Sequence, residues 1–169
     1  TASPASMSGG MLGAGQSEVT FTPAGTGQVR VAEHGVYRLA RYPSGPTEDL
    51  VALWLWSGRL SVASHESALS LHGLSDAMPS KHHITLPLAW KSRRVRYPSG
   101  TVPHFADVPE EDRAPLGALP VTTPLRTVVD CILDHVQPDL VEQAIRDGVR
   151  RGAFSRSDVR ARARARRAA

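Results

Sequence analysis

The segment PVTTPLRTVVDCILDHV (residues 120–136) carries the clearest helical signal in the chain. Thr123 is a suitable N-cap, and Pro124 suits the first helical position because the N–H that it lacks needs no partner there. Apolar residues then recur at i, i+3, i+4, i+7, i+8 and i+11, namely at Leu125, Val128, Val129, Ile132, Leu133 and Val136. This spacing predicts an amphipathic helix with one face on the core.

The segments around this helix predict an α+β fold. Three β-type runs precede it, separated by Pro and Gly: HHITLPL (82–88), RRVRYP (93–98) and TVPHFADV (101–108). Further helical segments come before and after these runs, at residues 48–57, 64–73 and 138–151. This order predicts a small antiparallel sheet flanked by helices, with a wing-like β-hairpin before it.

The composition indicates a folded chain with an aliphatic core. Of 169 residues, 41% are hydrophobic and only 5% aromatic, and the length suits one or two folding units. The longest strongly apolar run, residues 50–56, is far shorter than the roughly 20 residues of a membrane-spanning helix. We therefore expect a cytoplasmic protein with no membrane association. The single cysteine, Cys131, excludes an internal disulfide, and we expect it to act as a small buried hydrophobe.

The N-terminal region predicts a leader and a hairpin. Residues 1–27 are rich in Gly, Ala, Ser, Thr and Pro, which predicts a flexible leader of native or foreign origin. Residues 28–40 contain two β-type runs around a central turn, the pattern of a β-hairpin. Arg30, His34 and Arg38 in this hairpin could lie along a nucleic-acid backbone like the wing of a winged helix. The alternative is a surface hairpin of mixed polarity.

Positive charge gathers at the C-terminal end. The net charge is +4, yet residues 146–169 contain nine arginines and only two aspartates. Because arginines attract phosphates, this segment predicts binding of polyanions without sequence preference. The candidate nucleic-acid contacts are Arg150, Arg151, Arg156, Arg160, Arg162 and Arg164. Arginine at every second residue spreads charge all round a helix instead of building one stripe, and a solvent-exposed end without a binding role is the alternative.

The histidines do not form a local metal motif. A zinc-protease helix carries His-Glu-x-x-His, because residues four apart place both imidazoles on one face. His65 and His72 are seven residues apart, about 10.5 Å of helix rise, which is too far for one shared ion. His82 and His83 begin a strand and so point to opposite faces. We expect no metal and no cofactor and, since nucleophile and phosphate-loop motifs are lacking, no enzymatic activity; convergence of residues distant in the sequence stays open.

Several phrases, in order, carry a family resemblance. They are HGVYRL, EDLVALWLWS, SHESALSLHGLSDAMPSKHHITLP, HFADVPEEDRAPLGALPVTTPLRTVVDC and AIRDGVRRGAFSRSDV. Together these phrases, over roughly residues 28–160, resemble the AbiEi family of antitoxins from type IV toxin–antitoxin (abortive infection) systems. Members of that family look like two-part proteins. An N-terminal winged helix-turn-helix binds operator DNA and represses the operon, and a C-terminal domain counters a nucleotidyltransferase toxin.

The resemblance implies a non-enzymatic antitoxin and transcriptional autorepressor. Its partners would be DNA, either operator or non-specific, and a cognate toxin. The implied signature residues are structural: Ser64, His65, Ser67, Leu71, His72, Gly73, Thr123, Pro124, Arg126 and Asp130. Ser64 would cap a helix, the leucines would pack, and the histidines would form hydrogen bonds within the domain.

The resemblance also sets the expected domain limits. A hairpin remnant at residues 28–40 would precede an antitoxin domain at 41–154 and an Arg-rich tail at 155–169. Residues 1–27 contain no recognition helix, so the winged helix-turn-helix is truncated or degenerate and DNA binding could be weakened. The alternative is a non-specific nucleic-acid-binding or nuclease-like protein of a phage-defence locus, in which His65, Glu66 and His72 meet distant acids.

Overall fold

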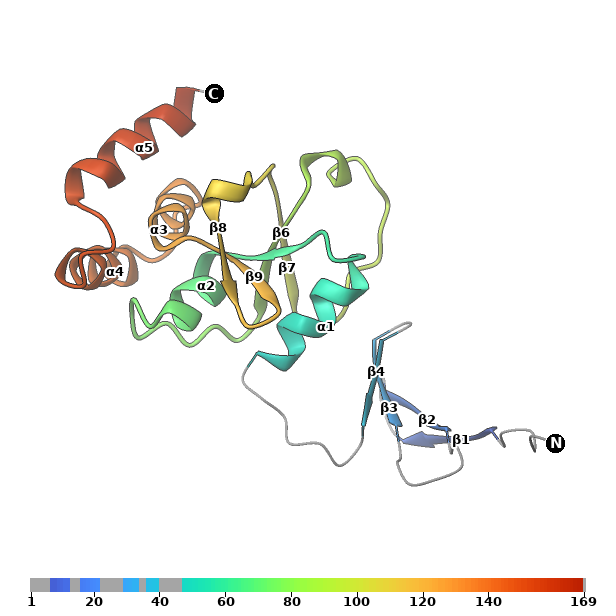
Figure 1. The fold of residues 1–169 in the computed structure, drawn as a ribbon. Helices are drawn as coiled ribbons and strands as arrows, with labels where there is room; N and C mark the ends of the chain where they lie inside the picture. The colour runs from blue at the N-terminus through green and yellow to red at the C-terminus, as the bar shows by residue number, and fades with distance from the viewer. Residues whose placement is uncertain (1–6, 13–15, 22–28, 34–35, 40–46, 169) are drawn as a thin grey trace. The chain divides into compact units, whose positions relative to one another are not determined.

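The computed structural model describes residues 7–12, 16–21, 29–33, 36–39 and 47–168 (Figure 1). The chain divides into two compact units, residues 1–59 and 60–169. Among the described residues no helix combines the length and the apolar character that crossing a membrane requires.

The first unit consists of two strand pairs and one helix. Strands β1 (Met7–Leu12) and β2 (Gln16–Phe21) pair antiparallel, as do β3 (Val29–Glu33) and β4 (Val36–Leu39). The side chains of Arg30, His34 and Arg38 lie outside the described residues, so their role in a wing stays a prediction. The segment expected as a leader, residues 1–27, contains the pair of β1 and β2.

Helix α1 (Glu48–Trp56) completes the first unit. Leu50 and Leu53 are buried, whereas Leu55 is 40% exposed. The apolar sequence of this segment predicts a central, buried helix, and that prediction is wrong, because only one side of α1 is covered.

The second unit combines a five-stranded sheet with four α-helices. In chain order its elements are β5 (Val62–Ala63), α2 (His65–His72), β6 (His82–Leu86), the short 3₁₀ helix η1 (Leu88–Trp90), β7 (Thr101–Phe105), the 3₁₀ helix η2 (Glu110–Asp112), β8 (Arg113–Leu116), β9 (Leu119–Thr122), α3 (Pro124–Leu133), α4 (Pro138–Arg150) and α5 (Arg156–Ala168). The α+β class is therefore confirmed. Helices α2, α3, α4 and α5 lie together on one side of the sheet (Figure 1).

The sheet is mixed and not antiparallel as expected. The strand order is β7-β6-β5-β9-β8, in which β6–β7 and β5–β9 pair parallel and the other two pairs antiparallel. A parallel pair needs a connection of about a dozen residues or more, and residues 87–100 provide one between β6 and β7. The strand predicted at 93–98 does not form, since that segment is part of this connection. The sequence does not predict the hairpin of β8 and β9, because the prolines in both strands are typical of a loop.

Helix α3 forms the centre of the helical layer. Val128, Val129 and Cys131 are fully buried, so the predictions of an amphipathic helix and of a buried cysteine are confirmed. Burial raises the pKa of the Cys131 thiol, which keeps it uncharged. The Thr123 hydroxyl accepts a hydrogen bond from the backbone N–H of Arg126 at 3.4 Å.

Gly148 in α4 lies against the ring of Phe154. A Cβ at this position would meet the Phe154 ring at 2.1 Å, far inside contact distance. We expect Gly148→Ala to lower the free energy of unfolding by about 2 kcal/mol, since the overpacking outweighs the gain in helix propensity. Urea denaturation of a double-mutant cycle with Phe154→Leu tests the cause. If the penalty is as large beside leucine as beside phenylalanine, the ring is not responsible.

Candidate functional site

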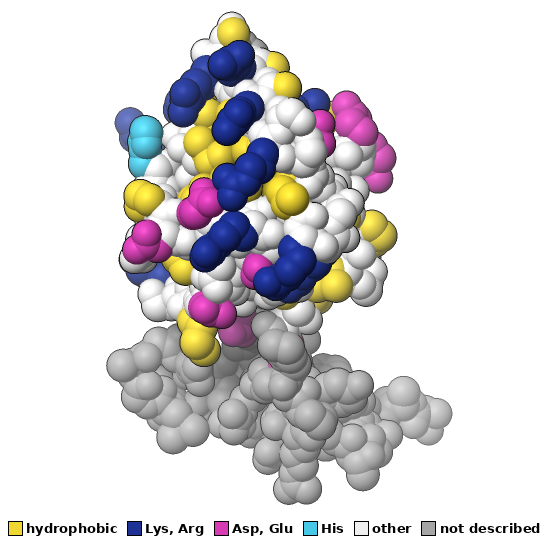
Figure 2. Space-filling model, turned by 90° about the vertical axis from the view of Figure 1, so that its left-hand side faces the viewer, with side chains coloured by type: hydrophobic (Ala, Val, Ile, Leu, Met, Phe, Trp, Pro, Cys, Tyr) yellow, Lys and Arg dark blue, Asp and Glu magenta, His cyan; other side chains and the backbone are white. Residues whose placement is uncertain are grey.

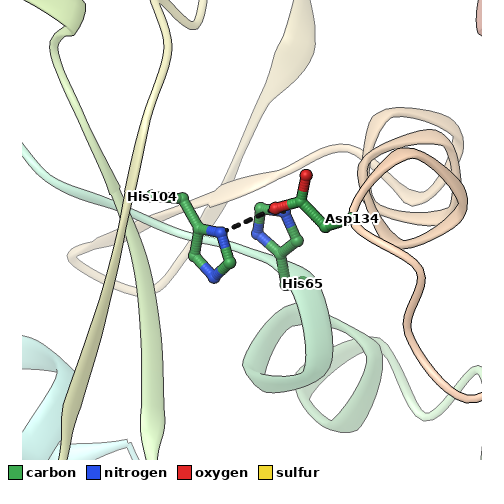
Figure 3. Close-up of side chains that lie close together, drawn as sticks. All are labelled: His65, His104 and Asp134. Atoms are coloured by element: carbon green, nitrogen blue, oxygen red, sulfur yellow. Dashed lines mark hydrogen bonds and ion pairs between the residues drawn. The ribbon is translucent and has the colours of Figure 1, made fainter.

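Three side chains from distant parts of the sequence converge in the second unit. His65 begins α2, His104 lies in β7 and Asp134 follows α3 (Figure 3). His65 Nε2 is 3.0 Å and His104 Nδ1 is 2.8 Å from the same atom, Asp134 Oδ2. The two imidazole rings are stacked, with centroids 3.5 Å apart and 12° between their planes. One carboxylate oxygen therefore faces two imidazole nitrogens, and we call these three residues the His–Asp cluster.

Buried hydroxyls orient His65. Its Nδ1 lies 2.9 Å from Ser64 Oγ, which in turn accepts a hydrogen bond of 2.8 Å from Thr85 Oγ1. Because the Ser64 hydroxyl accepts from Thr85, its own proton is free to go to His65 Nδ1. His65 then carries its proton on Nε2 and donates it to Asp134. Ser64 is the N-cap residue of α2, as expected, but its side chain makes no capping hydrogen bond to the helix, because this hydroxyl bonds His65 and Thr85 instead.

His83 orients His104 from the other side, and Glu66 lies beside His83. His83 Nδ1 lies 3.1 Å from His104 Nε2, and His83 Nε2 lies 3.7 Å from Glu66 Oε2. Since His104 donates from Nδ1 to Asp134, its Nε2 accepts, and His83 donates to it. Both ring nitrogens of His104 therefore have partners, and the hydrogen bonds of the cluster all run toward the carboxylate.

Strand register and the start of α2 bring these residues together. His83 and Thr85 are two residues apart in β6, so their side chains lie on the same face of the sheet. The parallel register places His104 of β7 beside Thr85 on that face. The backbone N–H of Ser64 donates to the carbonyl of His83, and the backbone N–H of His83 donates to Ser67 Oγ at 2.8 Å. His65 has φ +50°, a backbone conformation that β-carbon-bearing residues adopt rarely. Both backbone polar groups of His83 in β6 therefore bond the first turn of α2.

Asp134 carries a negative charge beside the neutral ring of His104. Burial lowers the pKa of His83 and of His104 from 6.5 to about 4. The hydrogen bond from His65 lowers the pKa of Asp134 from 3.8 to about 2. At neutral pH, His83 and His104 are therefore uncharged and Asp134 is ionised. A cavity of about 240 Å³ adjoins the cluster, and Lys91 and Arg166 line it.

The structure separates His72 from the His–Asp cluster. His72 Nε2 donates to the carbonyl of Thr122 at 2.7 Å, which joins α2 to β9. Arg151 donates to the carbonyls of His72 and Gly73, and Gly73 ends α2 in the left-handed conformation at φ +57°. Leu71 is half-buried. These residues serve the fold and do not line the cavity.

A buried ionic network lies beneath α5. Arg126 is 1% exposed; its Nε lies 2.9 and 2.8 Å from the two Asp130 oxygens, and its Nη1 donates to Asp112 at 2.7 Å. Arg162 donates to both Asp112 oxygens at 2.7 Å, and Arg166 lies 3.5 Å from Asp130. Burial alone would raise the pKa of Asp112, but the hydrogen bonds from the two arginines hold it below its ordinary value.

The acidic run VPEEDRAP (residues 108–115) is broken by proline and predicts a solvated loop, and this network shows that prediction to be wrong for Asp112. Asp112 at the end of η2 is 6% exposed and is the acceptor of both Arg126 and Arg162. Asp112 stands in an acidic run three residues after Pro109, and nothing in the neighbouring sequence indicates that it is buried. Arg126, Asp130 and Thr123 were identified from the resemblance, but Asp112 was missed.

The arginines of α5 are sorted into two rows. Val159 and Ala163 face the core, and Arg162 and Arg166 flank them and reach the buried acids. The other row lines a groove of about 250 Å³ between α3, α4 and α5: Arg156, Arg160, Arg164 and Arg167. The expectation that charge spreads evenly round the helix is therefore wrong. Figure 2 shows basic side chains with apolar ones between them on the face of α4 and α5.

The predicted nucleic-acid contacts divide by their partners. Arg150 pairs with Asp147 at 2.9 Å and Arg156 with Glu142 at 2.8 Å, both near the surface. Among the described residues, Arg160, Arg164 and Arg167 have no carboxylate in ion-pairing distance. We call these three the free arginine row.

Comparison of the sequence with protein-family models and with curated proteins gave no match.

Proposed function

We propose that the chain is an antitoxin of a type IV toxin–antitoxin system that counters a nucleotidyltransferase toxin and binds the DNA of its own operon. The resemblance of its ordered phrases to that family suggests the proposal. The single structural observation that supports it is the free arginine row, which offers three unneutralised cations along one side of α5. Such a surface favours a binding protein whose partner is polyanionic.

The groove fits a nucleic-acid backbone. From Arg160 to Arg167 the helix rises about 10.5 Å, a length along which a nucleic-acid strand presents about two to three phosphates. Contacts to phosphates fix position without reading sequence, so α5 supplies affinity and not operator recognition. In this proposal the hairpin with Arg30, His34 and Arg38 adds further contacts to the nucleic-acid backbone, as a wing does. The buried partners of Arg162 exclude it from this surface.

Electrophoretic mobility shift on the promoter fragment and on scrambled DNA, at about 50 and 200 mM salt, tests the proposal. We expect replacement of the free arginine row by glutamine to weaken binding and to reduce the dependence on salt by about two to three counterions. Replacement of Arg93, Arg94 and Arg96 by glutamine is the matched control, because it removes the same charge from another exposed segment. Unchanged binding by the α5 variant would exclude the groove as the contact.

The same assay separates an autorepressor from a non-specific nucleic-acid-binding protein. A preference for the promoter that persists at 200 mM salt supports an autorepressor. Equal binding of both DNAs, lost at 200 mM salt, supports instead a non-specific nucleic-acid-binding protein. Rescue of growth in cells that express the toxin gene of the same operon then tests the antitoxin activity directly.

A second candidate function, nuclease-like hydrolysis, is favoured by one observation: His65 meets Asp134 and His104 beside a cavity with basic residues. Both ring nitrogens of His65 and of His104 are engaged, so the metal-free cluster has no free imidazole nitrogen to accept a proton. Hydrolysis would therefore need a metal-bound water. Incubation of DNA and RNA with Mg²⁺, Mn²⁺ or Zn²⁺ tests this function, and cleavage that His104→Gln does not affect would exclude the cluster as its site.

A further inference from the structure

We propose that His65, His104 and Asp134 form a binding site for a divalent transition-metal ion, zinc above all, with a coordination position open to the adjacent cavity. This inference is independent of the antitoxin proposal. Sequence spacing argues against such a site for His65 with His72. The structure brings different partners to His65, one from β7 and one from the end of α3.

The three donor atoms have the chemistry and the spacing of a zinc site. One ligand atom from each of His65, His104 and Asp134 lies within 4.8 Å of the other two. Two imidazoles and one carboxylate are a ligand set found at zinc sites that keep a fourth position for water. With bonds of about 2.0 to 2.2 Å, ligand atoms around one ion lie roughly 3 to 3.5 Å apart. The distances of 3.0 and 2.8 Å to Asp134 Oδ2 are close to that range.

The surrounding hydrogen bonds suit both the metal-free and the metal-bound state. When an ion replaces the two protons that face Asp134, His65 must carry its proton on Nδ1 and His104 must carry its proton on Nε2. Ser64 Oγ can accept the first, and His83 Nδ1 can accept the second. His83 then carries its own proton on Nε2, directed at Glu66 Oε2, which is 3.7 Å away. Metal-binding histidines usually have such partners on their second nitrogen, often a carboxylate.

The open side of the site faces the cavity of about 240 Å³. Asp134 has a side chain that is 48% exposed and follows the last turn of α3, so its carboxylate can turn toward an entering ion. An ion lies in the plane of each imidazole that binds it, and stacked rings cannot both point at one ion. Entry of the metal therefore tilts the rings of His65 and His104 apart, and the adjoining cavity provides the room.

Zinc titration of the full chain, freed of metal with a chelator and competed against a chromophoric chelator, tests the proposal. We expect one ion per chain and at least tenfold weaker binding in Asp134→Asn and in His104→Gln. Glu66→Gln should weaken binding about tenfold or more through His83, as losses of outer partners do. The matched control is His135→Asn, which replaces an exposed histidine next to Asp134. Asparagine is among the residues that adopt a φ of +55° most readily.

Cobalt substitution provides a spectroscopic readout that a purely structural cluster would not give. Co²⁺ bound by two imidazoles and a carboxylate should show visible absorption bands in the wild type and in His135→Asn, and lose them in Asp134→Asn. Failure of the wild type to bind zinc or cobalt at micromolar concentration would overturn the proposal. Binding of equal strength in Asp134→Asn and His104→Gln would overturn it too, because the metal would then lie elsewhere. If His104→Gln does not fold, Asp134→Asn decides alone.

Discussion

Replacing Arg126 with methionine should lower the free energy of unfolding by about 3 to 5 kcal/mol. Arg126 is 1% exposed and bonds Asp130 and Asp112, which are themselves nearly buried. Methionine fills much of the volume, but of the cations in the described residues only Arg166, at 3.5 Å, then remains beside Asp130. The cost is therefore that of an uncompensated buried charge and not the modest cost of a lost surface ion pair.

Urea denaturation at neutral pH measures this effect, and Arg162→Met is the matched control. Arg162 bonds the same Asp112, but its side chain is 41% exposed and Asp112 retains Arg126 when it is removed. We expect the control to lose about 1 kcal/mol. Equal losses in the two variants would contradict the central place of Arg126 and would mean that the attachment of α5 dominates the network.

The helices were predictable because their signal is local. The apolar spacing of α3 and the Pro138 start of α4 are present in adjacent residues, and so are the strands β6 and β7. The direction of strand pairing was not predictable in the same way. The direction depends on the end of the sheet to which a long connection brings the chain back, as between β6 and β7. The order of elements in the sequence does not specify that end.

The His–Asp cluster lay beyond sequence reasoning for the same reason. The exclusion of a shared site for His65 and His72 followed from helix geometry alone. His104 and Asp134, however, come from separate elements, and no local motif joins either of them to His65 in the sequence. Strand alternation places His83 and Thr85 on one face, but only the parallel register with β7 brings His104 beside them.

The sorting of the α5 arginines shows how tertiary packing changes the meaning of a pattern. As an isolated helix, the segment carries charge on all sides. Once Val159 and Ala163 face the core, Arg162 and Arg166 are directed to Asp112 and Asp130. The remaining arginines are left on the groove side, so buried acids that lie far away in the sequence decide which arginines can bind a partner.

The metal-free protein should lose stability as the pH falls from 6.5 to 4. The pKa of His83 and of His104 is about 4 in the folded chain, chiefly through burial, against an ordinary value of 6.5. Below pH 6.5 the unfolded chain takes up protons that the folded chain refuses, so the free energy of unfolding falls until the folded pKa is reached. Asp134, with its pKa lowered to about 2, adds a further loss only below its ordinary value of 3.8.

We expect this fall to amount to about 3 kcal/mol between pH 7 and 4, roughly half of what two such pKa shifts would give in full, because both rings are partly solvated. Urea denaturation at pH 7, 6, 5 and 4 measures it. The double variant His83→Gln/His104→Gln removes both imidazoles and should flatten the dependence over this window, whereas the exposed-site variant His135→Asn should retain it. The hydrogen-bonded Asp112, whose pKa is also lowered, titrates below its ordinary value of 3.8, outside this window. If the free energy of unfolding falls with pH equally in the wild type and the double variant, the prediction is wrong. The two rings would then take up protons in the folded chain as readily as in water, despite their burial beside His65.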